Sequence, residues 1–164
     1  MDMSFREKSA WGLLLGIVVV SVFYFPAAFR IVEAMPDGSP RAAPLIAISV
    51  FGVIALIVIE IVYHAFIAAL SRDVDSDERD ALIDLKAERN GGFALGFGLF
   101  WLVGFIVIQS VVKAYPVPAA MEIAVYILLT LTVSEIVKLM SQLWYYPVSY
   151  THLRAHETAS FISY

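Results

Sequence analysis

The chain has 164 residues, of which 60% are hydrophobic and 16% charged, and its formal net charge is −4. Soluble domains carry about 25% charged residues, so this chain has too few to cover a water-facing surface. The absence of cysteine excludes disulfides, thiol catalysis and thiolate metal sites, and no basic patch points to nucleic acid as a partner.

Four long apolar stretches follow one another, each long enough for the roughly 20 residues that a spanning helix needs. We expect helices at about residues 10–28, 43–70, 92–112 and 119–146. Helices are the only open-chain structure that satisfies the backbone in hydrocarbon. The sequence therefore predicts an all-α, polytopic transmembrane four-helix bundle over residues 1–147, with the lipid bilayer as its immediate partner.

The first stretch follows two cations, Arg6 and Lys8, as the apolar part of a signal peptide does. It is longer than the ~7–15 residues usual for that part. We therefore expect a retained helix rather than a cleaved leader.

Small residues at helical spacing occur in the first and third stretches, at Gly12 and Gly16 and at Gly92 and Gly96. Such pairs let helix backbones approach closely. We expect both pairs to lie in helix contacts, with Gly98 and Gly104 extending the second.

Ionisable side chains interrupt the second and fourth stretches. Glu60 and His64 are four residues apart, and Glu135 and Lys138 are three apart, so each pair shares a helix face. Charged groups in hydrocarbon are costly unless paired or hydrated, and all four lie at similar depth. We expect the second and fourth helices to be neighbours, with both glutamates pointing into the bundle. The resulting polar cluster is either a proton or cation relay or hydrogen-bonding glue between helices.

The charged connector, residues 71–90, predicts a short helix of its own, with acids first and bases last as the helix dipole favours. Three alternating aspartates resemble a calcium loop, but Glu78 and Asp84 stand where that loop requires Gly and Glu, so no metal is expected. The apolar side, which we expect the membrane or the bundle to cover, consists of Leu82, Ile83, Leu85 and Ala87. The candidate connector motif consists of Asp77, Glu78, Arg79, Asp80, Lys86 and Arg89.

The pattern Leu-x-Val-x-Glu-Ile-Val occurs at residues 56–62 and again at residues 131–137. Both copies fall at nearly the same depth in helices of the same direction. This repetition predicts two duplicated helical hairpins. The alternative is coincidence, because Leu, Ile and Val are common in such helices.

Lys and Arg residues gather on one side of the membrane, with six in the N-terminal tail and the connector against three in the opposite loops. Short cytoplasmic loops of membrane proteins carry this excess. We therefore expect both termini and the connector to lie in the cytoplasm.

Residues 77–89 read D-E-R-D-x-L-I-x-x-K-A-x-R, and residues 135–146 read E-I-V-K-x-x-S-Q-L-x-Y-Y. With their place beside hydrophobic hairpins, these motifs resemble an uncharacterised prokaryotic family of small four-helix membrane proteins. The resemblance covers most of residues 5–147. It implies a fold and a place in the prokaryotic inner membrane, but no activity and no cofactor.

Residues 148–158 read V-S-Y-T-H-L-R-A-H-E-T, which is similar to the translation of a transposon-type sequencing adapter. We therefore expect residues 148–164 to be an artefactual tail, with a native chain that differs after about Pro147. The alternative is a genuine amphipathic tail. In an adapter, the metal-ligand spacing of His152 and His156 has no meaning.

Two functions fit these features. The first is a regulatory or interaction protein whose connector engages a cytoplasmic or membrane partner. The second is a small proton- or cation-linked transporter, built as a homo-oligomer around Glu60, His64, Glu135 and Lys138. An enzyme is not expected, because the chain lacks a Ser-His or Asp-Asp constellation, an H-E-x-x-H motif and a phosphate-binding glycine loop.

Overall fold

The computed structural model describes residues 5–34, 42–70, 78–112 and 120–161, and the described residues form four helices and no strand. The helices are α1 (Phe5–Glu33), α2 (Ala42–Leu70), α3 (Glu78–Val112) and α4 (Ala120–Phe161). Each contains a stretch that is long and apolar enough to cross a membrane. The chain is thus an all-α protein with four candidate membrane spans, as the sequence predicted.

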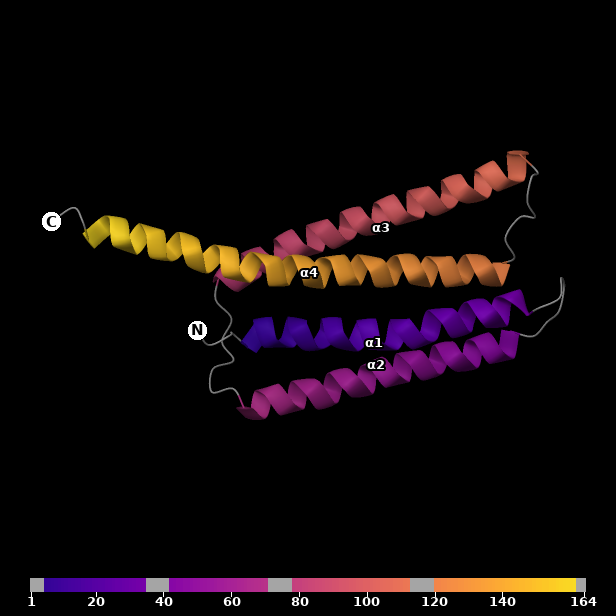
Figure 1. Ribbon diagram of the computed structural model, residues 1–164, viewed down its shortest axis with the longest axis horizontal. Helices are drawn as coiled ribbons and strands as arrows, with labels where there is room; N and C mark the ends of the chain where they lie inside the picture. Colours follow the sequence, from indigo (N-terminus) through magenta and orange to yellow (C-terminus); the bar gives the residue numbers. More distant parts are fainter. Residues whose placement is uncertain (1–4, 35–41, 71–77, 113–119, 162–164) are drawn as a thin grey trace.

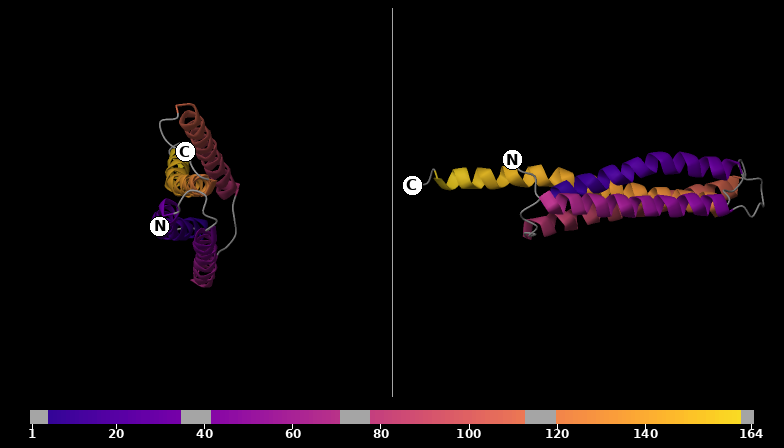
Figure 2. Two further views of the ribbon diagram at one scale, coloured as in Figure 1. Left: turned by 90° about the vertical axis from the view of Figure 1, so that its right-hand side faces the viewer. Right: turned by 90° about the horizontal axis from the view of Figure 1, so that it is seen from below.

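The helices lie side by side in the order α2, α1, α4, α3 (Figure 1), and extensive packing occurs only between neighbours in this order. Viewed along the helices, α2 and α3 lie at the two ends of an open arrangement (Figure 2, left). The expectation that the second and fourth helices pack directly on each other is wrong, because α1 lies between them.

Glycines bring α1 and α2 close together. A Cβ atom on Gly12 would overlap the ring of Tyr63, and a Cβ atom on Gly16 would lie 3.1 Å from Ile59 Cγ2. The first small-residue pair therefore lies in a helix contact, as expected.

One expected glycine, Gly98, and one that was not expected, Gly91, bring α3 and α4 together. Added Cβ atoms on Gly91 and Gly98 would lie 3.0 and 2.5 Å from the nearest α4 atoms. In contrast, nothing lies within 4 Å of a Cβ atom built on Gly92, Gly96 or Gly104. The expectation for this second pair is wrong, because the residues that face α4 follow a seven-residue spacing that includes Gly91 and Gly98.

The predicted connector helix and the predicted third span are one continuous helix, α3, so the expectation of two separate elements is wrong. Two consecutive glycines, Gly91 and Gly92, favour a break, since each costs about 1 kcal/mol relative to alanine. Packing on α4 offsets this cost: Ser134 Oγ donates a hydrogen bond to Gly91 O at 2.9 Å, and Asn90 Nδ2 donates one to Ser141 Oγ at 3.1 Å. At 1.5 Å per residue α3 is about 52 Å long, so its charged first part extends beyond the ~30 Å hydrocarbon core.

An apolar cluster joins α1, α2 and α4 at the end of the molecule opposite the connector. It consists of the buried side chains of Ala28, Leu45 and Val125, with aromatic residues of α1 packed against them.

The backbone of α4 remains helical to Phe161, beyond the expected end at residue 146, although its apolar span does end at Tyr146. The extension projects away from the other helices (Figure 1). Once a helix exists, each further residue adds one hydrogen bond at little cost, so helical backbone does not reveal the origin of residues 148–164.

Candidate functional site

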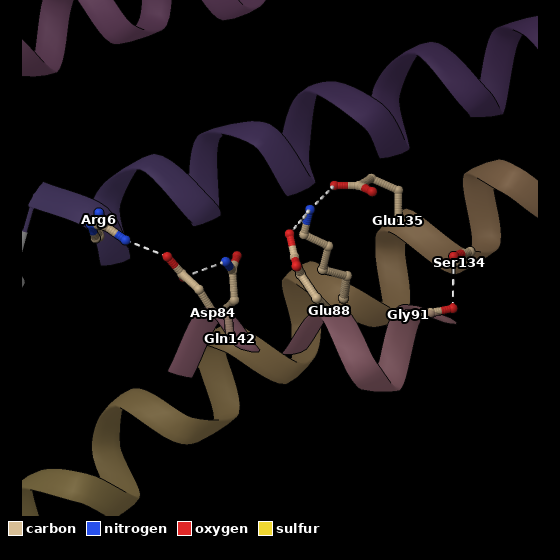
Figure 3. Close-up of polar contacts among 8 residues, drawn as sticks. Arg6, Asp84, Glu88, Gly91, Ser134, Glu135 and Gln142 are labelled. Carbon is tan, nitrogen blue, oxygen red and sulfur yellow. Dashed lines mark hydrogen bonds and ion pairs between the residues drawn. The ribbon is translucent and has the colours of Figure 1, made fainter. Parts of the chain in front are cut away.

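Asp84 is the centre of a polar network that joins α3 to both middle helices. Arg6 of α1 donates a hydrogen bond to Asp84 Oδ2, and Gln142 Nε2 of α4 donates one to Asp84 Oδ1 at 2.9 Å (Figure 3). Arg6 Nε also lies 3.9 Å from Asp80 Oδ2. These charge-assisted bonds fix the first part of α3 against α1 and α4.

Tyr146 anchors the beginning of α3. Its side chain is 2% exposed and lies near the Asp80 carboxylate, and its backbone oxygen accepts a hydrogen bond from Arg79 at 3.0 Å. Ile83 and Ala87, 3% and 0% exposed, continue the same side of the helix.

Leu82 and Leu85 lie on the other side of α3 and are 57% and 65% exposed. The expectation of a covered apolar side therefore holds for Ile83 and Ala87, but the protein itself does not cover Leu82 or Leu85. The covered stripe follows the helical spacing of three and four residues, and the two leucines fall outside it. The exposed members of the connector motif are Glu78, Lys86 and Arg89. Asp77 lies outside the described residues.

Lys138 of α4 joins two glutamates. Its Nζ lies 3.5 Å from Glu135 Oε1 on the same helix and 3.7 Å from Glu88 Oε1 of α3 (Figure 3). All three side chains are partly exposed. Such pairs contribute about 0–1 kcal/mol each, so they orient the side chains more than they stabilise the fold.

His64 of α2 is held between its own helix and α1. Its Nδ1 lies 2.9 Å from the backbone oxygen of Glu60, and its Nε2 lies 2.5 Å from Ser9 Oγ. A carbonyl oxygen only accepts, so Nδ1 carries a hydrogen, and in the neutral ring Nε2 accepts from the Ser9 hydroxyl. Both ring nitrogens are therefore satisfied, as expected of a polar contact between helices.

The four residues of the expected polar cluster form two separate pairs, Glu60 with His64 and Glu135 with Lys138, and no contact joins one pair to the other. Glu60 lies one turn from Leu56, and Glu135 lies one turn from Thr132. Leu56 and Thr132 both line a small pocket of about 150 Å³ beside α1. Each glutamate therefore lies about one helical turn from this pocket, which residues of α1, α2 and α4 line together.

No family model, curated protein or solved structure matches the chain. Functional inference consequently rests on its own geometry. Among the described residues, no group of three or more His, Asp or Glu side chains could hold a metal ion.

Several residues of the network were missed from the sequence. The signal for the covered stripe was present, because Asp80, Ile83, Asp84 and Ala87 recur at helical spacing. Their partners could not be predicted, since Arg6 entered only the signal-peptide and loop-charge arguments and nothing in one sequence pairs it with Asp84.

Proposed function

We propose that this chain is a regulatory or interaction protein of a prokaryotic inner membrane, and that it binds a protein partner through the exposed side of the first part of α3. The observation that carries the proposal is the exposure of Leu82 and Leu85, 57% and 65%, on a helix whose opposite side is fixed. Apolar anchors on a rigid helix are the usual contacts for a partner's groove.

The depth of the two leucines supports a protein partner. Gly91 begins the uncharged part of α3, and Leu85 and Leu82 precede it by six and nine residues. At 1.5 Å per residue they lie about 9 and 14 Å from it, whereas the polar layer of a bilayer is only ~5–8 Å thick on each side. Leucines at this distance from Gly91 lie beyond the bilayer, so lipid does not cover them. The exposed charges of Lys86 and Arg89 beside them would supply specificity for the partner.

The partner would be cytoplasmic or would have a cytoplasmic part. Six Lys and Arg residues on the connector side against three opposite support this orientation, and the family resemblance supports the prokaryotic inner membrane. In intact cells, a membrane-impermeant maleimide should label Glu33→Cys and leave Leu85→Cys unlabelled until the membrane is permeabilised. Labelling of Leu85→Cys alone would reverse the orientation.

Photocrosslinking tests the interaction. A photoreactive amino acid replacing Leu82 or Leu85 should yield a discrete protein adduct in living cells, whereas the same replacement at Phe100, an exposed residue of the membrane-spanning part, should yield lipid adducts only. Leu82→Glu combined with Leu85→Glu should remove the protein adduct formed from a photoreactive residue at Lys86, without lowering the protein level. Equal protein adducts from Leu82, Leu85 and Phe100 would contradict the proposal.

A second candidate function is a small proton- or cation-linked transporter. The observation in its favour is that the Glu60 carboxylate has no hydrogen-bond or ion-pair partner among the described residues, although it lies in an apolar span. Such a group is costly unless it is protonated or hydrated. In reconstituted vesicles, Glu60→Gln should abolish proton flux, whereas Glu122→Gln, a change to a glutamate that Tyr126 already hydrogen-bonds, should not. Absence of flux in the unmodified protein would dismiss this candidate.

A further inference from the structure

A groove runs between α3 and α4 on the membrane-spanning surface, with a volume of about 670 Å³. Its wall includes Phe97, Trp101 and Phe105 of α3 and Tyr126 and Thr130 of α4. The two hydroxyl groups in this wall are already satisfied, since Thr130 Oγ1 donates to Tyr126 O at 2.9 Å and the Tyr126 hydroxyl donates to Glu122 at 3.1 Å. The groove therefore presents apolar surface to the bilayer and suits a hydrocarbon chain.

A cationic side chain lies beyond the connector end of this groove. Ala94 lines the groove, and Asn90 and Lys86 precede it at intervals of four residues, which puts all three on one side of α3. Lys86 Nζ lies 5.7 Å from the centroid of the Tyr145 ring, whose hydroxyl accepts a hydrogen bond from Asn90 Nδ2 at 3.2 Å. Within the described part of the chain, no carboxylate lies within ion-pair distance of the Lys86 ammonium group, so its charge is available to a ligand.

The height of Lys86 matches the phosphate layer of a membrane. It precedes Gly91, where the uncharged part of α3 begins, by five residues, or about 7.5 Å along the helix. The headgroup layer extends ~5–8 Å from the hydrocarbon core. An acyl chain in the groove would therefore bring the phosphate of its own lipid to the level of Lys86.

We propose that the groove between α3 and α4 binds one anionic phospholipid from the leaflet on the connector side. An acyl chain fills the apolar groove beside Trp101, and the phosphate pairs with Lys86. Charge selects the occupant, because the site is uncharged at the depth of hydrocarbon and cationic at the depth of phosphate. A second copy of the chain would have to bring its own anion to that level.

Native mass spectrometry of the purified chain, titrated with phosphatidylglycerol or phosphatidylcholine, tests this proposal. The first phosphatidylglycerol should bind about fivefold more tightly than the first phosphatidylcholine, the factor expected for one charge near the membrane surface. Lys86→Gln should remove this preference. The matched control is Arg30→Gln, which removes an exposed charge in the last turn of α1, at the opposite end of the molecule, and should keep the preference.

The groove itself is tested by Ala94→Trp, which should weaken binding of both lipids because it occupies the space of the acyl chain. Leu99→Trp, on another side of α3, should leave binding unchanged. Equal effects of Lys86→Gln and Arg30→Gln would overturn the proposal, as would a dimer that forms on removal of lipid and disappears with Ala94→Trp. The outcome is independent of the proposed connector partner, since no other protein is present in the titration.

Discussion

The two ends of the molecule are held together in different ways. At the connector end, side chains such as Arg6, Asp84 and Gln142 join α1, α3 and α4 through ion pairs and hydrogen bonds. At the opposite end, Ala28 and its neighbours form an apolar cluster. Polar contacts near water gain little free energy but require a particular geometry, whereas close packing in lipid depends on small side chains at the contact. We infer that the apolar end contributes more of the stability and the connector end positions the exposed face of α3.

The largest effect is expected at the apolar end, for Ala28→Leu. Ala28 is 0% exposed and lies against Leu45 and Val125, and extra methyl groups in a packed site cost about 1–3 kcal/mol. Unfolding of the purified protein by added SDS, followed by circular dichroism, measures the loss. The control is Ala43→Leu, an exposed position on α2. A similar loss for both variants would mean that the apolar end is not specially packed.

A smaller effect is expected at the connector end, for Asp84→Asn. This change removes the negative charge that faces Arg6 but keeps an acceptor for Gln142. Because the Arg6 and Asp84 side chains are 38% and 34% exposed, the loss should not exceed about 1 kcal/mol, and it should shrink in high salt. Proteolysis near the start of α3 should nevertheless become faster. Glu78→Gln, at an exposed position, is the control, and an equally fast cleavage of that variant would remove the assigned role of Asp84.

The smallest effect is expected for removal of residues 148–164. If this segment is a translated adapter, the truncated chain should insert, purify and unfold as the full chain does, with the contacts of Tyr146 retained. Loss of membrane insertion, or a marked drop in stability on truncation, would instead indicate a genuine tail. Sequencing the source gene again provides an independent check of the same point.

The features of the fold that depend on the sequence of a single helix were predictable. Long apolar stretches predicted the four spans, and the spacing of Gly12 and Gly16 predicted one contact face. Predictions failed for the features that depend on how two helices pack against each other. Gly91 resembles a helix break until Ser134 and Lys138 of α4 occupy the space that a side chain would need. Likewise, the neighbours of α2 depend on how hairpins pack, which hydrophobic pattern alone does not encode.

In the candidate site too, contacts within one helix were predictable and contacts between helices were not. The pairing of Glu135 with Lys138 follows from a three-residue spacing on one helix and was predictable. The pairing of Asp84 with Arg6 joins residues that are 78 positions apart. No local rule brings such residues together, so the network that fixes the connector became visible only with the tertiary structure.

The central claim is that the first part of α3 is a fixed helix with one covered and one exposed side. Because the chain contains no native cysteine, single cysteines report on their own positions. In permeabilised membranes, a water-soluble maleimide should label Leu82→Cys and Leu85→Cys quickly and Ile83→Cys and Ala87→Cys at least about tenfold more slowly, as expected for opening of a packed helix face. Equal rates at all four positions, or slow labelling of the two leucine positions alone, would contradict the account.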